Sequence, residues 1–201
     1  MKVAVLGGGH GGYAAAADLT IRGFDVSLFT FSADRAAAFR KQDNQLMYEG
    51  VWGNGQCRIG CVTNHIGEAV DGADLVVMNV PGTGHETYLE ALQPYLNEDT
   101  VLYMNPGHSG GALRAAGILR RGRIAESNTL SYIARKTSET SVRVSSSDKP
   151  VTVGVFPADQ TEDVLSVIRR AYPHVVAARN VLESSLCNVN AMFHPPGMLL
   201  N

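Results

Sequence analysis

The sequence is poor in cysteine and in charge of either sign, and each shortage excludes a class of protein. Three cysteines among 201 residues are too few, and odd in number, for a disulfide framework, and they suit a reducing compartment. The 17 lysines and arginines against 19 aspartates and glutamates give a formal net charge of −2. A surface that neutralises a nucleic-acid backbone would be strongly basic, so we expect no nucleic-acid partner.

Long apolar runs are also missing. No uncharged apolar stretch reaches the roughly 18 residues of a membrane-spanning helix. The apolar run after Lys2 is cut by glycines after four residues, too early to form the hydrophobic region of a signal peptide. We therefore expect a soluble, cytoplasmic protein with no membrane partner.

The cysteines do not form a recognisable metal motif either. Cys57, Cys61 and His65 are loosely spaced and lack a fourth ligand. We expect ordinary strand and loop positions there, and no metal.

Apolar strands and helical segments alternate along the chain, which indicates an α/β fold. Residues 3–6 form an apolar run that ends at glycines, residues 13–22 form an alanine-rich helical segment, and residues 25–30 form the next apolar run. Such alternation is typical of parallel strands joined by helices, so we expect a Rossmann-type, doubly wound, mostly parallel sheet. Further helices are expected at 34–41, 86–96, 112–120 and 161–171, and further strands at 75–80, 100–104, 131–135, 142–146, 151–156 and 175–176.

Two stretches have a different pattern. Residues 45–62 carry glycines among β-forming residues, which suggests a hairpin. Residues 141–145 alternate polar and apolar side chains, which predicts a strand with one exposed face.

The first strand runs directly into a G-x-G-x-x-G turn that opens a helix. Gly7 permits the tight turn, Gly9 lets the backbone approach a pyrophosphate, and Gly12 lets helix and strand pack closely. The helix that begins after His10 offers free N–H groups to phosphates. The turn therefore predicts a dinucleotide site that includes these four residues, against the alternative of a purely structural glycine turn.

The end of the second strand bears on the choice between NAD and NADP. An acidic residue there would hold the ribose 2′-OH of NAD, whereas this sequence has Thr30, Ser32 and Arg35. Hydroxyls and an arginine can bind a 2′-phosphate, which favours NADP over NAD without excluding NAD. The alternative for Arg35 is a solvated residue in the first turn of a helix.

Two more turns follow predicted strands, where open α/β sheets bind ligands. Val80 and Pro81 in the first turn are expected beside the nicotinamide, and His108 in the second is placed to meet a substrate carboxylate. Alternatively, His85 and His108 are solvent-facing loop histidines.

The last segment is predicted to be helical. Asn180 can cap a helix with Glu183 as its capping-box partner, and apolar residues then recur at helical spacing. The chain stops on apolar residues, so we expect a piece of a longer protein. If this piece is expressed alone, the exposed apolar face of the helix could drive a homodimerisation that the intact protein does not use.

This helix also carries a candidate acid/base. Asn190 and His194 are four residues apart, so they share a helix face and the amide could orient the imidazole. Pro195 and Pro196 lack N–H groups and are expected to kink or end the helix. A histidine beside such a kink can serve as an acid or base near neutral pH, while the alternative is a packed or solvated histidine.

Taken together, these motifs resemble the opine dehydrogenases, the octopine/nopaline and carboxyalkyl-amino-acid dehydrogenase family. The resemblance covers essentially the whole chain in order. It rests on Val5 through Gly12, on Asn105-Pro106-Gly107, and on Val181-Leu182 through Asn188-x-Asn190-x3-His194-Pro195 with Leu199-Leu200-Asn201.

The resemblance implies an NAD(P)H-dependent enzyme that joins the α-amino group of an amino acid to a 2-oxo acid and reduces the imine. His194 would be its catalytic acid/base, and His108 and Asn190 would face the substrates. Residues 1–179 would form the dinucleotide-binding domain, and residues 180–201 would begin an all-helical catalytic domain that continues past Asn201 and supplies an aspartate. Alternatives are another 2-oxo or hydroxy-acid dehydrogenase of the same architecture, or a non-catalytic NAD(P)-binding module.

Overall fold

The computed structural model describes residues 1–120 and 122–199 and contains one large sheet and one small sheet. The strands of the large sheet are β1 (Lys2–Leu6), β2 (Asp25–Phe29), β5 (Cys61–Thr63), β6 (Leu75–Met78), β7 (Val101–Met104), β8 (Arg123–Ser127), β11 (Val151–Phe156) and β12 (Val175–Ala177). Their order is β12-β11-β8-β7-β6-β1-β2-β5. All neighbours from β5 to β8 are parallel, and only the β8–β11 pair is antiparallel.

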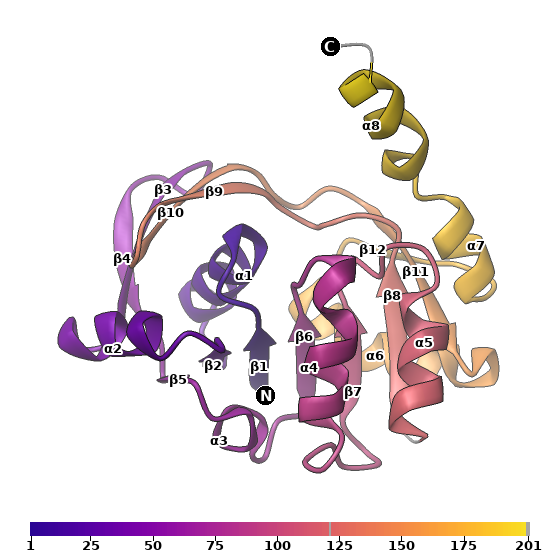
Figure 1. Ribbon diagram of the computed structural model, residues 1–201, viewed down its shortest axis with the longest axis horizontal. Coiled ribbons are helices and arrows are strands. Elements are labelled where there is room, and N and C mark those ends of the chain that lie inside the picture. The colour runs from indigo at the N-terminus through magenta and orange to yellow at the C-terminus, as the bar shows by residue number, and fades with distance from the viewer. Residues whose placement is uncertain (121, 200–201) are drawn as a thin grey trace.

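Helices cover both faces of this sheet (Figure 1). The helices in the described residues are α1 (His10–Ile21), α2 (Ala33–Lys41), α3 (Ile66–Val70), α4 (His85–Leu92), α5 (Gly111–Leu119), α6 (Thr161–Ala171), α7 (Val181–Leu186) and α8 (Asn190–Leu199), with short 3-10 turns at Gly82–Gly84 and Ala158–Gln160. Helix α8 does not cover the sheet but projects away from it.

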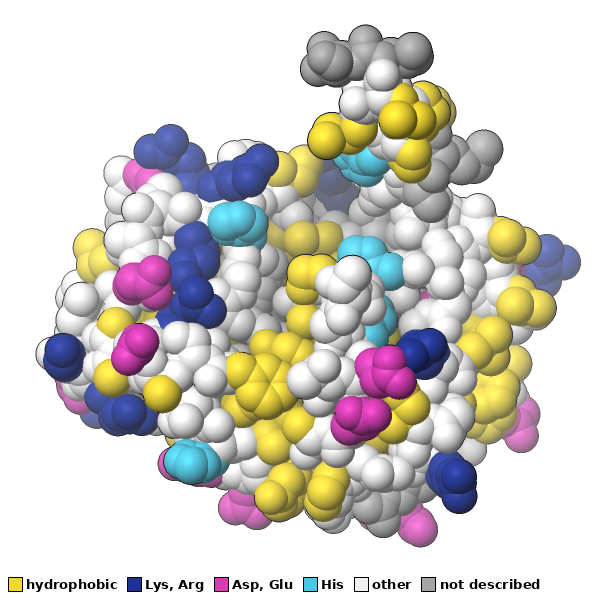
Figure 2. Space-filling model, viewed as in Figure 1, with side chains coloured by type: hydrophobic (Ala, Val, Ile, Leu, Met, Phe, Trp, Pro, Cys, Tyr) yellow, Lys and Arg dark blue, Asp and Glu magenta, His cyan; other side chains and the backbone are white. Residues whose placement is uncertain are grey.

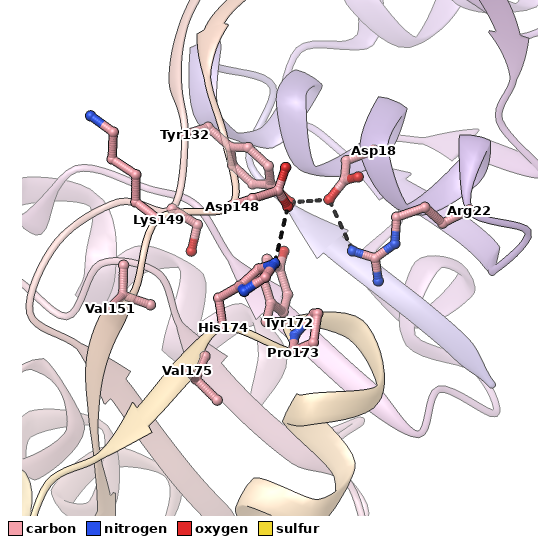
Figure 3. A pocket seen from close by; sticks show the side chains of 11 residues that line it. Asp18, Arg22, Tyr132, Asp148, Lys149, Val151, Tyr172, Pro173, His174 and Val175 are labelled. Atoms are coloured by element: carbon pink, nitrogen blue, oxygen red, sulfur yellow. Dashed lines mark hydrogen bonds and ion pairs between the residues drawn. The ribbon is translucent and has the colours of Figure 1, made fainter. Parts of the chain in front are cut away.

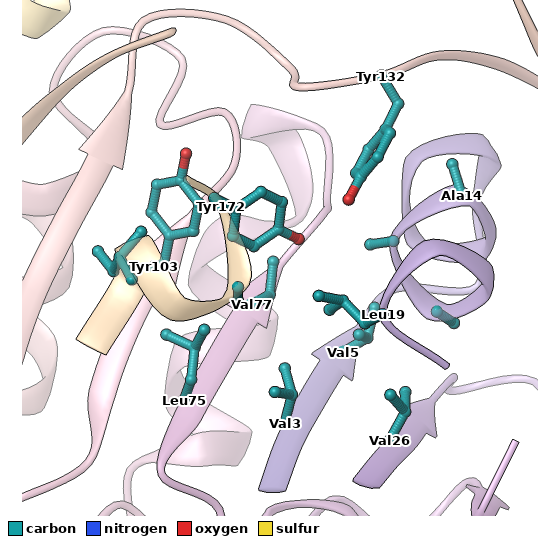
Figure 4. Packing of buried hydrophobic residues seen from close by; sticks show 14 of the residues in the cluster. Val3, Val5, Ala14, Leu19, Val26, Leu75, Val77, Tyr103, Tyr132 and Tyr172 are labelled. Carbon is teal, nitrogen blue, oxygen red and sulfur yellow. The ribbon is translucent and has the colours of Figure 1, made fainter. Parts of the chain in front are cut away.

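The two-sided cover follows from the alternation of side chains along each strand. Val3 and Val5 pack with α1 and α6, whereas Ala4 and Leu6 pack with α3, α4 and α5. Figure 4 shows Val3 and Val5 in the first of these two clusters. The expected doubly wound, mostly parallel sheet is therefore confirmed.

The small sheet lies on the outer side of α1. Its strands are β3 (Gln45–Gly50), β4 (Gly55–Arg58), β9 (Ile133–Ser138) and β10 (Ser141–Ser146), in the order β4-β3-β10-β9. Helix α1 contacts strands of both sheets, so it is enclosed on two sides. This position explains its run of four alanines, Ala14–Ala17, all fully buried, since a helix enclosed on two sides needs small apolar residues all round.

The small sheet confirms two sequence predictions. Strands β3 and β4 form the expected antiparallel hairpin. In β10, Val142 and Val144 are buried while Arg143 is exposed, as the alternating pattern predicts.

The prediction of one continuous terminal helix is wrong. Helix α7 ends at Leu186 and α8 begins at Asn190, because Asn188 interrupts the helix and its Oδ1 accepts the Asn190 N–H at 3.2 Å. Asn180 caps α7 as predicted, accepting from the N–H groups of Leu182 and Glu183. The Glu183 carboxylate, however, accepts from the Arg179 N–H rather than from the cap residue itself.

Of the two outcomes predicted for the prolines, a kink or an end of the helix, the end does not occur. Pro195 and Pro196 lie inside α8, which continues to Leu199. A proline has a helical φ, and it opposes a helix through its missing N–H and the contact of its ring with the carbonyl four residues earlier. Residues 193–199 are exposed, so water can solvate the carbonyls that lose their partner. The last two residues of the predicted segment, Leu200 and Asn201, lie outside the described residues.

Candidate functional site

A large cleft lies at the carboxyl ends of four neighbouring parallel strands, β1, β6, β7 and β8. Its volume is about 660 Å³. The strand order reverses between β1 and β6, and open α/β sheets bind ligands at such a point. In Figure 2, histidine side chains gather around the hollow beneath the projecting α8. The lining residues are Gly9, His10, Gly11, Asn79, Val80, Pro81, Asn105, Pro106, His108, Ser109, Asn128, Thr129, Leu130, Asn188, Asn190 and His194.

The structure thus brings together seven of the residues predicted from sequence. They come from both ends of the chain: Gly9, His10, Val80, Pro81, His108, Asn190 and His194. The other five predicted residues, Gly7, Gly12, Thr30, Ser32 and Arg35, do not line the cleft. Thr30 and Arg35 lie next to Gly8 of the glycine turn.

The three motif glycines of the turn, Gly7, Gly9 and Gly12, lie in different environments. Gly7 has a φ of +123°, and a Cβ added there would lie 2.5 Å from the Asn79 carbonyl oxygen. A Cβ added at Gly12 would lie 1.7 Å from the Gly7 carbonyl oxygen, so α1 and β1 pack too closely for any side chain. At Gly9 nothing lies within 4 Å, so this position faces open space. No side chain caps the N-terminus of α1, which begins at the next residue.

The polar residues after β2 form hydrogen bonds with one another. Ser32 Oγ accepts the Arg35 N–H at 3.2 Å as the N-cap of α2. The Arg35 guanidinium lies 3.5 Å from Thr30 Oγ1. A Cβ added at Gly8 would lie 2.7 Å from that oxygen, which places the Thr30–Arg35 pair directly beside the glycine turn.

The two predicted loop histidines have different environments. His85 is buried at the start of α4 and its Nε2–H donates to the Val80 carbonyl at 3.2 Å, so the solvent-facing alternative is wrong for this residue. His108 is exposed, lines the cleft, and has its ring centroid 5.4 Å from that of His85. Burial, with the neighbouring His108, lowers the pKa of His85 to about 4, and burial also lowers the pKa of His108. These shifts favour the neutral form of both rings near pH 7.

The predicted contact between Asn190 and His194 is wrong. Both residues line the cleft, but the Asn190 amide donates to Thr129 Oγ1 at 3.1 Å instead of orienting the imidazole. The loop after β8 competes for the amide, and the sequence pattern could not show this because the loop is remote along the chain.

Helix α7 is fixed to the loop before α5 by Ser185. The Ser185 hydroxyl donates to Glu126, a buried carboxylate that also accepts the Ala112 N–H at 2.7 Å. The same hydroxyl accepts the Gly110 N–H at 2.9 Å, and Ser109 donates to the Ser185 carbonyl at 3.1 Å. These contacts hold the segment leading to His194 against the loop that carries His108.

Sequence reasoning missed the wall formed by Asn128, Thr129 and Leu130, because it did not predict β8. The signal was the apolar pair Ile124-Ala125 between glycine and asparagine, obscured by the charge of Glu126. Asn105 was singled out from sequence only as part of a motif, and its structural role was missed. It is fully buried and accepts from the Ser131 N–H at 3.1 Å, so it holds this loop in place.

A second cavity is far smaller, about 20 Å³ (Figure 3). The Tyr132 hydroxyl there donates to Asp18 Oδ2 at 2.8 Å, and Arg22 pairs with the same carboxylate at 3.4 Å. Burial raises the pKa of the Asp18 carboxyl. This volume is about that of one water molecule, so the network joins α1 to the loop before β9 and leaves no room for a substrate.

Within 1–120 and 122–199, no helix is both long and apolar enough to span a membrane. No three histidine, cysteine, aspartate or glutamate side chains in these ranges are grouped so as to hold a metal ion.

The chain matches known proteins along its length. Residues 2–105 match the family model of the NAD-dependent glycerol-3-phosphate dehydrogenase N-terminus. An opine dehydrogenase of Arthrobacter sp. (strain 1C) is 32% identical over 98% of this chain, which spans 56% of that enzyme.

Two solved structures have the same fold. One is octopine dehydrogenase with NADH and L-arginine, with a TM-score of 0.79 at 22% identity over 96% of this chain and 52% of that one. The other is yersinopine dehydrogenase with NADP⁺ bound, with a TM-score of 0.79 at 13% identity over 97% of this chain and 51% of that one.

The switch-point cleft and the glycine turn define the class as a Rossmann-type NAD(P)-binding fold. Within that class, the chain belongs to the family of the NAD-dependent glycerol-3-phosphate dehydrogenase N-terminus. Its expected similarity to the opine dehydrogenases is confirmed, and it spans about half the length of the relatives described above.

Proposed function

We propose that this chain is the cofactor-binding portion of an NAD(P)H-dependent opine dehydrogenase. The observation that carries the proposal is the single cleft into which the glycine turn, His108 and His194 all project. One wall has the geometry for a dinucleotide, and the opposite wall offers an imidazole. A binding module without catalysis would not need the second wall.

The cofactor would lie across the carboxyl ends of β1 and β6. Gly7, Gly9, His10 and Gly12 would hold the pyrophosphate at the open N-terminus of α1, and Val80 and Pro81 would flank the nicotinamide. When bound, the reduced nicotinamide would supply the hydride.

The cofactor preference is proposed to be NADP over NAD. Arg35 lies beside the glycine turn with Thr30, where a 2′-phosphate would meet a cation and a hydroxyl. Ser32 could contribute its hydroxyl proton, because its oxygen accepts the Arg35 N–H and the proton remains free to donate.

The substrates would be an amino acid and a 2-oxo acid that form an imine in the rest of the cleft. His194 would hold or donate a proton at the substrate nitrogen or oxygen as the former keto carbon is reduced. His108 and Asn190 would position the substrates, the histidine by hydrogen bonding in its neutral form. Residues 1–179 would be the cofactor domain, and residues 180–201 would begin a helical domain with the remaining catalytic groups.

The test is NADPH oxidation by the whole enzyme with a panel of amino acids and pyruvate. We expect turnover only when both substrates are present, and we expect His194→Ala to abolish it while the Kd for NADPH stays nearly unchanged. Turnover with the 2-oxo acid alone would instead indicate a hydroxy-acid dehydrogenase. Full activity of the His194→Ala variant would refute the catalytic role.

A homodimer in the cytoplasm completes the proposal. Exposed apolar side chains on α7 and α8 supply a surface for a second copy; they include Leu182, Leu186, Phe193, Met198 and Leu199. Sedimentation of the 201-residue chain as a monomer would contradict the homodimer. Recovery of the whole enzyme in another cell fraction would contradict the cytoplasmic location.

A further inference from the structure

The tip of the β9–β10 hairpin carries a carboxylate to the cations beside the glycine turn. Glu139 Oε2 lies 3.3 Å from Arg35 Nε and 3.6 Å from Lys136 Nζ. The Tyr13 hydroxyl donates to the Glu139 carbonyl at 2.7 Å and fixes the backbone of this turn on α1. The Glu139 side chain itself is 64% exposed, so the carboxylate can rotate into water while the turn stays in place.

Lys136 is the second cation of this group and was not a candidate from sequence. Its side chain is only 14% exposed, and its Nζ lies 4.5 Å above the Tyr13 ring. Its backbone N–H donates to His10 Nδ1 at 2.9 Å, which joins β9 to the first residue of α1. The small sheet therefore delivers a largely buried cation to the rim of the glycine turn.

The Arg35–Glu139 pair lies where a ribose of the dinucleotide would lie. The Arg35 guanidinium lies next to Gly8, since an added Cβ there would be 3.0 Å from its Nη1. In Rossmann-type sites the group after the second strand recognises the ribose 2′ position: an acid accepts the 2′-OH of NAD, and a cation takes the 2′-phosphate of NADP. Here the acid comes from the hairpin and the cation from α2, and the two are bonded to each other.

We propose that Glu139 sets the cofactor preference by occupying the position of the 2′-phosphate between Arg35 and Lys136. With NADH, the carboxylate stays and accepts the 2′-OH. With NADPH, the phosphate displaces it, takes both cations and leaves Glu139 to water. The inference rests on the dinucleotide site of the proposed function and makes the preference for NADP a balance between one carboxylate and two cations.

The expected change in NADPH affinity follows from the weakness of exposed ion pairs. Such pairs are weak, and NADPH must break two of them and meet the repulsion of a nearby carboxylate. Removing the charge of Glu139 should therefore tighten NADPH binding by about 3- to 10-fold. The difference should shrink as ionic strength rises, because these groups are partly exposed.

The test is fluorescence titration of the 201-residue chain with NADPH and with NADH. We expect Glu139→Gln to lower the Kd for NADPH and to leave the Kd for NADH unchanged or raised. We expect Lys136→Met to raise the Kd for NADPH more than that for NADH. The control is Glu49→Gln, which removes a partly exposed glutamate whose carboxylate lies 2.9 Å from Arg143 on the small sheet. It should change neither Kd.

The outcomes separate this inference from the proposed function. An unchanged ratio of the two Kd values in Glu139→Gln, with both cofactors still bound by the unmodified chain, would overturn the inference alone. Failure of the unmodified chain to bind either dinucleotide would overturn the proposed function, and this inference with it.

Discussion

Gly12 and Gly9 show how differently two glycines of one motif are constrained. A methyl group at Gly12 would meet the Gly7 carbonyl at 1.7 Å, whereas one at Gly9 would meet nothing within 4 Å. The first position is closed by backbone, which cannot move aside as a side chain can. The second is left open toward the cleft.

We expect Gly12→Ala to destabilise the fold and Gly9→Ala to leave its stability nearly unchanged. Forcing α1 away from β1 should lower the free energy of unfolding by about 3 kcal/mol or more, as overpacking of a close contact does. Urea unfolding of both variants checks this. Equal midpoints for the two would show that the close approach of α1 to β1 does not constrain Gly12.

His85 makes the stability of the fold depend on pH. Its pKa falls from 6.5 to about 4 on burial, so below pH 6.5 the unfolded chain binds a proton that the folded chain does not. The free energy of unfolding should therefore fall as pH drops from about 6.5 to about 4, by about 1–3 kcal/mol from this residue, and then level off.

The measurement is a series of urea unfolding curves between pH 4 and pH 7, with His85→Gln and His65→Gln compared. The first substitution keeps an amide N–H for the Val80 carbonyl and removes the titration, so it should flatten the curve. The second replaces an exposed histidine and controls for the loss of a histidine at the surface. A slope that survives in His85→Gln would assign the dependence to other groups, His108 among them.

Among the helices and strands, α7 packs closely on β11 at Gly154, which has no side chain. A Cβ added at Gly154 would lie 2.6 Å from the Val181 Cα and 2.4 Å from Ser184 Oγ. The helix can reach Glu126 and the loop before α5 through Ser185 only if it lies this close to the sheet.

We expect Gly154→Ala to displace α7 and to cost about 1–3 kcal/mol, as overpacking does. Gly117→Ala is the matched control, since this exposed glycine in α5 has no atom within 4 Å of an added Cβ. It should instead stabilise the fold by about 0.5–1 kcal/mol through helix propensity. Hydrogen exchange at α7 separates the two, and unchanged protection there in Gly154→Ala would contradict the predicted displacement.

The elements that the sequence predicted well are those with a strong local signal. Strand β1 has four consecutive apolar residues, and α6 has acidic residues in its first turn, arginines in its last turn and a regular apolar face. Strand β8 was missed because its Glu126 is satisfied by partners from distant segments, the Ala112 N–H and the Ser185 hydroxyl. The break between α7 and α8 was missed for the same reason, since Asn188 is bonded to Ser109, far away along the chain.

At the scale of the whole molecule, the large sheet follows from local patterns and the small one does not. Alternating strands and helices with right-handed crossovers leave few arrangements, and the doubly wound sheet is one of them. The parallel pairing of β3 with β10, which aligns Met47 with Ser141, joins segments that share no turn. Only the burial of α1 from its outer side requires that pairing, and that requirement is not visible in either strand alone.

The difference between local units and distant packing also decides which site residues could be predicted. Gly9 and His108 could be predicted as site residues because each lies in a turn directly after an apolar strand. The local sequence shows where such a strand ends. Lys136 and Glu139 were not, since they reach the glycine turn only through the packing of the small sheet on α1.

The central claim is that the open space at Gly9 is a dinucleotide site, and calorimetric titration tests it most directly. We expect the 201-residue chain to bind NADPH or NADH at one site with micromolar affinity. We expect Gly9→Ala to unfold at the same urea concentration and to bind at least tenfold more weakly (about 1.4 kcal/mol), because the added methyl group occupies the approach of the pyrophosphate. A chain that binds neither cofactor, or a Gly9→Ala variant that binds as tightly as the unmodified chain, would contradict the claim.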